Sequence, residues 1–240
     1  MALGLTRVAV VRPPRVGILS SGDEVVDPTL TPQPGQVRDI NSYTLAALVE
    51  RHGGCPQPYG ILPDRRQPLR DALQRGLREC DLVVITAGSS ASTRDLTAEV
   101  IAEMGQPGVL VHGVNVKPGK PTILAVCDGK PVIGLPGNPV SALVIAGLFV
   151  VPVIHRLLGL PSGFFQPAVP ARLSTNVPSQ AGREDWFPVR LVREKQGYRA
   201  EPIFYKSNLI FTLAQADGMV HIPADATGLE VGDEVAVYLM

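Results

Sequence analysis

Short apolar segments that alternate with helical patterns constrain the fold of this chain more than any other feature. Residues 81–86 form a continuous apolar run, which is typical of a strand buried on both faces of a sheet. Leu69, Leu73 and Leu77 recur at a spacing of four, which predicts a helix with one apolar face. Further strands are expected at 16–19, 57–62, 109–116, 122–126 and 131–135, and further helices at 43–52, 95–104 and 140–158. The alternation predicts a three-layer α/β/α domain with a mainly parallel sheet.

The pattern changes near residue 160. The last third of the chain contains short strand-like stretches separated by turn signals, at 168–173, 186–193, 198–202, 219–222 and 234–239. Such a series predicts a small β-barrel domain. We therefore divide the chain into a lead-in at residues 1–14, an α/β domain at 15–160 and a β-barrel domain at 165–240.

Composition excludes several classes of protein. The chain has 22 basic and 22 acidic residues, whereas binding to nucleic acid or to membrane surfaces by general electrostatics needs a basic excess. The longest apolar run, residues 143–154, contains Pro152 and is too short to span a bilayer. The first residues lack the pattern of a signal peptide, so we expect a cytoplasmic protein. Cys55, Cys80 and Cys127 show no CxxC spacing and are expected to be buried, reduced thiols.

Four strands are followed by loops of unusual content. These loops are residues 20–24, 63–64, 86–95 and 136–141. In an open parallel sheet, ligands bind beyond the carboxyl ends of the strands. We therefore expect the four loops to converge on one ligand site.

The loop at residues 86–95 combines hydroxyl side chains with the start of a helix. Backbone N–H groups and the helix dipole favour an anion there, and a guanidinium adds planar donors for phosphate. The alternative is a cap rich in serine and threonine that serves only its own helix. The candidate ligand-binding residues are Thr86, Gly88, Ser89, Ser90, Ser92 and Arg94.

A second candidate is the turn Leu135-Pro-Gly-Asn-Pro139. Asn138 is a good capping residue, Pro139 suits the first helical position, and Gly137 permits close approach of a ligand to the backbone. The helix would then present free N–H groups to the crevice, although a well-formed helix start is the simpler alternative. The candidates in this turn are Pro136, Gly137, Asn138, Pro139 and Ser141.

Two lysines lie on a rigid turn at residues 117–121. Lys117 and Lys120 are two of only five lysines in the chain, and they flank Pro118-Gly119. Because prolines restrict the backbone, the ammonium groups lose less entropy on binding an anion than they would on a free loop. A solvated turn without a ligand is the alternative.

Carboxylates accompany these predicted anion sites. Asp23, Glu24, Asp64 and Asp95 lie in or beside the strand-end loops. Acidic residues in an otherwise cationic pocket suit Mg²⁺ that bridges phosphate, or the handling of an oxyanion. Each of them could instead be a turn or capping residue.

Three motifs occur in a fixed order along the chain, SGDE at 21–24, KPGKP at 117–121 and LPGNPVSA at 135–142, and a polar stretch runs from Arg183 through KSNL at 206–209 to Ile222-Pro223. The three motifs together resemble the MoeA family of molybdopterin molybdenumtransferases, and the last stretch is similar to the terminal β-domain of that family. The resemblance covers about residues 12–240. It implies a MogA/MoaB-like α/β domain followed by a β-barrel.

The resemblance also implies an activity and roles for residues. Members of the family insert molybdate into adenylylated molybdopterin, the molybdopterin-AMP substrate, with Mg²⁺ and with release of AMP. By motif, Glu24 and Asp64 match acidic residues tied to activity, and Asp95 falls where the family has an acidic residue at the end of its glycine loop, so these three are the candidate catalytic residues. Lys117 and Lys120 match lysines that face phosphate or molybdate. Asp23, Glu24 and Asp64 become the candidate metal ligands. Implied partners are the pterin itself, a second copy of the full-length chain and a molybdopterin adenylyltransferase.

The sequence departs from the family in two places. Residues 86–93 read TAGSSAST where the family usually has TSGGVSVG, and the N-terminal half of the family does not occur in these 240 residues. Two alternatives therefore stay open beside the transferase. One is a non-catalytic module that binds or senses molybdopterin, and the other is an adenylyltransferase of the MogA type.

Overall fold

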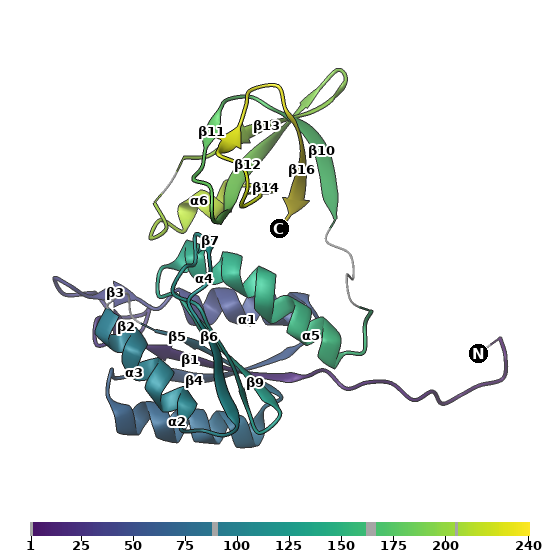
Figure 1. Ribbon diagram of the computed structural model, residues 1–240. Helices are drawn as coiled ribbons and strands as arrows, with labels where there is room; N and C mark the ends of the chain where they lie inside the picture. The colour runs from purple at the N-terminus through teal and green to yellow at the C-terminus, as the bar shows by residue number, and fades with distance from the viewer. Residues whose placement is uncertain (1, 88–90, 162–166, 205) are drawn as a thin grey trace.

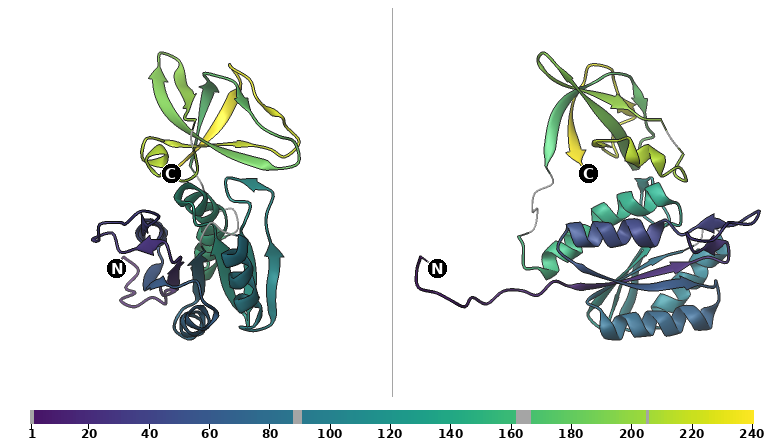
Figure 2. Two further views of the ribbon diagram at one scale, coloured as in Figure 1. Left: turned by 90° about the vertical axis from the view of Figure 1, so that its left-hand side faces the viewer. Right: turned by 180° about the vertical axis from the view of Figure 1, so that it is seen from behind.

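Two domains stack on one another in the computed structural model of the chain (Figure 1). The structure describes residues 2–87, 91–161, 167–204 and 206–240. The α/β domain comes first and the β-domain follows, and the same two-tier arrangement is seen from the side and from behind (Figure 2). The first residues run away from the body as an extended segment.

The α/β domain is built on a six-stranded sheet of order β4-β1-β5-β9-β8-β6. The first four strands in this order are parallel, and β8 is antiparallel to both of its neighbours, β9 and β6, so that β6 runs in the same direction as the first four. This confirms the prediction of a mainly parallel sheet. The strands are β1 (Arg15–Ser21), β4 (Cys55–Leu62), β5 (Leu82–Thr86), β6 (Pro107–His112), β8 (Ile123–Cys127) and β9 (Lys130–Leu135).

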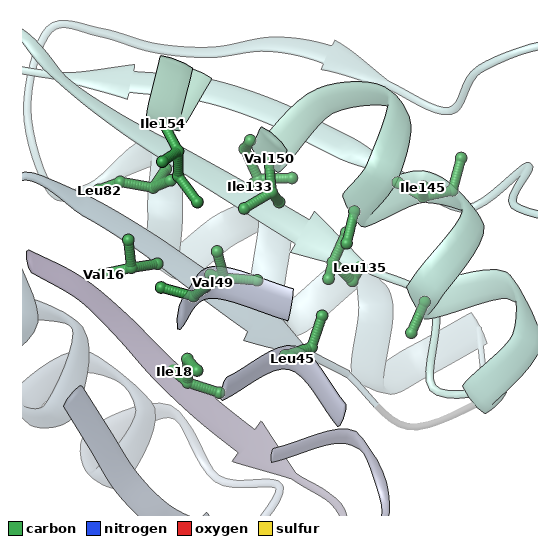
Figure 3. Close-up of a cluster of buried hydrophobic side chains, with 13 residues drawn as sticks. Val16, Ile18, Leu45, Val49, Leu82, Ile133, Leu135, Ile145, Val150 and Ile154 are labelled. Carbon is green, nitrogen blue, oxygen red and sulfur yellow. The ribbon is translucent and has the colours of Figure 1, made fainter. Parts of the chain in front are cut away.

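Helices cover both faces of this sheet (Figure 1). One face carries α1 (Asn41–Arg51) and the long helix 139–157, and the other carries α2 (Arg66–Glu79) and α3 (Ala91–Ala102). Figure 3 shows the core on the first face, where Val16, Leu82 and Ile133 of the sheet meet Val49 and Ile154 of the helices. Strands with buried side chains on both faces explain the continuous apolar runs in the sequence.

The long helix contains one turn of π-helix. It consists of α4 (Pro139–Ile145), η1 (Ala146–Val150) and α5 (Val151–Leu157). Pro152 has no N–H to donate, and a π-turn just before a proline relieves its clash with the preceding carbonyls.

This helix extends beyond the apolar run 143–154, which by itself is too short to cross a membrane. Within the described part of the chain, it is the one helix with the length and mean hydropathy of a membrane span, 19 residues and 2.1. The packing indicates a core helix, since Val140, Ile145 and Ile154 are fully buried.

The β-domain is a closed barrel of five strands. Its order is β13-β10-β16-β14-β12, and β12 also pairs with β13, which closes the ring. The predicted strands are found as β10 (Ala168–Leu173), β12 (Glu184–Glu194), β13 (Gly197–Pro202), β14 (Gly218–Ile222) and β16 (Glu234–Leu239). This confirms the barrel prediction.

Several short elements were not predicted. Helix α6 (Phe211–Ala214) lies within the β-domain, and two small ladders join β2 (Val25–Val26) to β3 (Val37–Arg38) and β11 (Val177–Pro178) to β15 (Gly228–Leu229). The sixth member of the barrel sheet is β7 (Val116–Lys117), which comes from the α/β domain and pairs with β12. The two domains therefore share a sheet.

Candidate functional site

The four strand-end loops converge, as the strand polarity predicted. Thr86 at the end of β5 is paired with Ser20 of β1 on one side and with Leu135 of β9 on the other. Ser21 is paired with Leu62, the last residue of β4. The loops after β4, β1, β5 and β9 therefore start side by side at the carboxyl ends of the parallel strands.

The acidic residues lie on two of these loops, which touch. The backbone N–H of Asp64 donates to Asp23 Oδ1 at 3.2 Å, and the N–H of Gly22 donates to the carbonyl of Leu62 at 3.2 Å. The half-buried Glu24 folds back over Gly22, where an added Cβ would come within 2.9 Å of Glu24 Oε2. The positive φ of 153° favours glycine at that position.

These carboxylates suit a hard cation only in part. The described residues contain no group of three His, Cys, Asp or Glu side chains that could hold a metal ion. Mg²⁺ is usually bound through one or two carboxylates and completes its shell with substrate phosphates and water. Asp23 and Asp64, which lie on touching loops, offer the number of carboxylates that this smaller requirement needs.

The loop after β5 becomes helical earlier than predicted. Helix α3 begins at Ala91, four residues before the expected start at Asp95, so Ser92, Arg94 and Asp95 belong to its first two turns rather than to a loop. Thr86 is buried and Asp95 is exposed. The predicted residues Gly88, Ser89 and Ser90 lie outside the described residues, as do the side chains of Ser92 and Arg94.

The turn before the long helix is held by both domains. Pro139 occupies the first helical position as expected, but Asn138 makes no capping hydrogen bond. Its Nδ2 donates instead to Ser207 Oγ at 3.0 Å, and the N–H of Val140 donates to the Ser207 carbonyl at 3.2 Å. The prediction of a capping Asn138 is therefore wrong, and the Val140 amide is not free for a ligand. Both donors, the Asn138 amide and the Val140 N–H, are bonded to Ser207 of the β-domain.

The same turn is tied to the first helix of the domain. Asn41 Nδ2 donates to the carbonyl of Gly137 at 2.9 Å, and Asn41 is itself buried at the start of α1. Pro136 and Ser141, the other predicted residues of this turn, are buried. The turn therefore connects α1, the sheet edge and the β-domain, and its polar groups serve this junction.

The lysine turn packs tightly against the long helix. Gly119 has φ of 135°, and a Cβ built on it would lie 2.3 Å from Ile145 Cδ1. The buried Thr122 donates through Oγ1 to the carbonyl of Gly119 at 2.6 Å. Lys117 and Lys120 remain exposed on either side of this buried centre. The backbone of the turn is thus held against the helix, and the two exposed lysines extend from it.

These two lysines line a pocket together with Arg183 of the β-domain. The pocket has a volume of about 320 Å³ and is formed by residues 114–117, 119–120 and 180–183. Arg183 Nε donates to Asp185 Oδ1 at 2.9 Å, and Lys117 Nζ lies 3.5 Å from Asp185 Oδ2. Three cations from two domains therefore converge at one small cavity, which is suited to an oxyanion.

A second, larger cavity lies between the same domains. It measures about 1,020 Å³ and is lined mainly by apolar residues of α1, of helix 139–157 and of the β-domain. His52 Nδ1 lies 3.2 Å from His155 Nε2 at this apolar cleft, and burial lowers the pKa of both histidines. Leu148, Trp186 and Met219 are among its lining residues.

Sequence reasoning had not assigned several residues of the junction. Arg183 and Ser207 entered only through the resemblance, and Asp185 and Asn41 were given no part in a ligand site. Three of these residues contact a partner far away in the sequence. Asp185 lies 68 positions from Lys117, Ser207 lies 69 from Asn138, and Asn41 lies 96 from Gly137. No spacing within the sequence signals contacts of this range. Also contrary to expectation, Cys55 is exposed, whereas Cys80 and Cys127 are buried free thiols as predicted.

Comparison with known families divides the chain as the two domains do. A family described as "Probable molybdopterin binding domain" matches residues 17–156. A second family, "MoeA C-terminal region (domain IV)", matches residues 170–240.

Curated relatives and solved structures agree with these matches. The chain is 33% identical over 236 residues to a molybdopterin molybdenumtransferase of Nostoc sp., covering 96% of this chain and 54% of the relative. It is 32% identical over 230 residues to a molybdopterin molybdenumtransferase of Haemophilus influenzae, covering 91% and 56%. A molybdopterin biosynthesis MoeA protein from Pyrococcus horikoshii superposes with a TM-score of 0.82 at 38% identity, covering 95% of this chain and 54% of that one. The chain therefore spans about half the length of the curated relatives it matches.

Proposed function

This chain belongs to the MoeA family, and from that premise we propose that it supplies the ligand-binding core for inserting molybdate into adenylylated molybdopterin, with release of AMP. One observation carries the proposal: Lys117, Lys120 and Arg183 converge on a small pocket at the domain junction. Molybdate is a dianionic oxyanion, and ammonium and guanidinium groups are the donors that bind such ions.

The pterin would occupy the adjoining edge of the sheet. The loop that follows Thr86 and the turn at residues 136–141 leave neighbouring strands, and we propose that they receive the phosphates and the pterin ring. Because the Val140 amide is bonded to Ser207, the hydroxyl-rich loop is the stronger phosphate site of the two.

Glu24, Asp64 and Asp95 are the proposed catalytic carboxylates. Release of AMP requires the oxygen of a water to bond to phosphorus while the phosphoanhydride bond to the pterin phosphate breaks. A carboxylate at the sheet edge would accept the proton of that water. Glu24 and Asp64 are half-buried on the two touching loops, which supports this role more directly than the exposed position of Asp95.

Mg²⁺ belongs to the same proposal. The carboxylates of Asp23 and Asp64, with Glu24 beside them, would hold the cation against the phosphates of the substrate. When bound, it would neutralise the charge that develops on the phosphate oxygens.

The test supplies the full 240-residue chain with adenylylated molybdopterin, Mg²⁺ and molybdate, and follows AMP by chromatography. We expect Glu24→Gln and Asp64→Asn to retain the pterin and to release AMP at least about a hundredfold more slowly, because each removes a proton acceptor at the usual cost of a general base. Glu50→Gln, an exposed carboxylate change on α1, is the matched control and should behave as wild type.

Each other outcome contradicts a specific part of the proposal. Wild-type rates in both variants would remove the proposed catalytic roles. Tight pterin binding without AMP release by the wild-type chain would identify a non-catalytic binding module. Consumption of ATP with molybdopterin would identify an adenylyltransferase.

Two protein partners complete the proposal. The adenylylated substrate has to be made by an adenylyltransferase, which we propose as a cytoplasmic partner of this chain. We also propose a homodimer for the full-length form. The extended N-terminal segment supports an apolar contact of this kind, because Leu3 and Val10 are 86% and 81% exposed. Sedimentation equilibrium of the chain measures this association directly.

A further inference from the structure

A buried carboxylate lies directly behind the cationic pocket. The side chain of Asp185 is 4% exposed, whereas those of its partners Lys117 and Arg183 are 56% and 32% exposed. The pocket is lined by these two cations and not by Asp185. The carboxylate therefore faces the cations from the protein side, and the oxyanion would face them from the solvent side.

The backbone fixes Asp185 in this place. In the parallel pairing of β7 with β12, Asp185 is the register partner of Lys117, and the N–H of Glu184 donates to the carbonyl of Asn115 at 2.9 Å. Glu184 itself lies 3.3 Å from His221 Nε2, so its carboxylate already has a partner in the barrel. Asp185 thus joins a lysine of one domain to an arginine of the other.

The geometry of the Arg183 fork depends on this carboxylate. Arg183 donates through Nε to Oδ1 at 2.9 Å and through Nη2 to Oδ2 at 3.4 Å, a two-point contact that restricts the plane of the guanidinium. The same contact occupies the Nε and Nη2 donors of Arg183, and the negative charge of Asp185 partly offsets the positive charge of the pocket. Three cations and one carboxylate leave a net charge of +2, which complements a dianion.

We propose that Asp185 is a positioning residue and an internal counter-charge for the oxyanion pocket. It holds Arg183 and Lys117 in place, and it lowers the affinity of the pocket so that a bound oxyanion remains exchangeable. This inference rests on the proposed function, because it concerns the same pocket. It assigns a separate role to a residue that touches the cations and not the oxyanion.

The experiment measures binding of molybdate, and separately of sulfate, to the full chain by calorimetry at low ionic strength. Asp185→Asn keeps the oxygen that accepts from Arg183 Nε but removes the charge, so it should bind either probe at least roughly fivefold more tightly than wild type. Asp185→Ala removes both, and should bind more weakly than Asp185→Asn because the guanidinium is no longer held. A merely structural role would make both variants weaker than wild type, and this result would overturn the inference.

A second pair of variants keeps the inference testable even if changes at Asp185 prevent folding. Arg183→Ala removes one cation and also exposes the carboxylate to the oxyanion, whereas Lys120→Ala removes a cation alone. Arg183→Ala should therefore weaken molybdate binding more than Lys120→Ala does. Equal losses in the two variants would contradict the counter-charge role of Asp185.

The proposed function can fail separately. If the wild-type chain binds neither molybdate nor sulfate, the oxyanion pocket is wrong, and the inference falls with it. If the wild-type chain binds them and Asp185→Asn is no tighter, the pocket stands and only the role of Asp185 is wrong.

Discussion

The two cavities at the domain boundary differ in size and in charge, and the smaller one has the features of an anion site. The apolar cleft measures about 1,020 Å³ and the cationic pocket about 320 Å³. The larger cleft is lined mainly by apolar side chains, and of its two arginines Arg51 already donates to the carbonyl of Met240. Burial of an unpaired charge among apolar groups is costly, so this lining suits an oxyanion less well. Charge and donor geometry, rather than volume, therefore favour the smaller cavity as the proposed oxyanion site.

One helix separates the two cavities. Ile145 of helix 139–157 packs under Gly119 of the lysine turn, while Val144 and Leu148 of the same helix line the apolar cleft. Changes on one side of this helix can therefore be compared with changes on the other.

The largest effect is expected from removing two cations of the pocket together. Lys120→Ala with Arg183→Ala should weaken molybdate binding by at least about a hundredfold, or about 2.8 kcal/mol, because each charge-assisted contact contributes roughly tenfold or more. Calorimetry at low salt measures the loss. The matched control is Arg156→Ala, a cation at the apolar cleft, which should leave molybdate binding unchanged. A comparable loss in the control would place the oxyanion in the larger cavity and reverse the comparison.

A smaller effect is expected where the lysine turn rests on the dividing helix. Gly119→Ala puts a methyl group 2.3 Å from Ile145 Cδ1 at a φ of 135°, and should lower the free energy of unfolding by about 2 kcal/mol. Urea denaturation measures this change.

Gly129→Ala is the control for backbone strain alone. Gly129 also has a positive φ, 83°, but no atom lies within 4 Å of an added Cβ. Its loss of stability should be clearly smaller than that of Gly119→Ala. Equal losses would mean that the contact between the turn and the helix contributes nothing beyond the backbone conformation.

The smallest effect concerns the histidines at the apolar cleft. Burial lowers the pKa of His52 and His155 below the ordinary value of 6.5, and His155 and Arg51 lower that of His52 further. The unfolded chain therefore binds more protons just below pH 6.5, so the free energy of unfolding should fall as the pH drops from 6.5 toward 5. We expect a change below about 1 kcal/mol, since both rings are partly solvated.

Urea titrations at several pH values test this dependence. His52→Gln should flatten it, whereas His112→Gln, an exposed histidine outside the cleft, should not. The titration is limited to pH values above 5 so that the histidines dominate the change. The hydrogen bond from Arg12 lowers the pKa of Asp81, and this carboxylate therefore remains ionised throughout the range. Molybdate binding should be unaffected by His52→Gln, which again separates the two cavities.

Much of the α/β domain could be predicted because its signals are local. The run at residues 81–86 and the leucines at 69, 73 and 77 reflect burial within single elements, and strand polarity was enough to predict that the loops converge. The start of α3 was missed because serine and threonine favour loops, whereas here they lie in the first turn of a helix.

The candidate site was harder to predict because it is assembled from distant segments. Asn138 has the chemistry of a helix cap, but its side-chain amide donates to Ser207 of the other domain. Lys117 was identified from its rigid turn, yet Arg183 and Asp185 depend on a pairing between β7 and β12 that no local pattern encodes. Sequence reasoning found one half of the pocket, and the fold supplies the other half.

The short strand β7 limits how the two domains can be recombined. Its residues lie in the α/β domain along the chain, yet their hydrogen-bonded partners Glu184 and Asp185 lie in the barrel. A chimera that takes its barrel from one relative and its α/β domain from another would mix the two sides of this pairing, and with them the two sides of the cationic pocket. Residues 116–117 and 184–185 should therefore be transferred together, and a barrel prepared alone would expose an unpaired strand edge open to self-association.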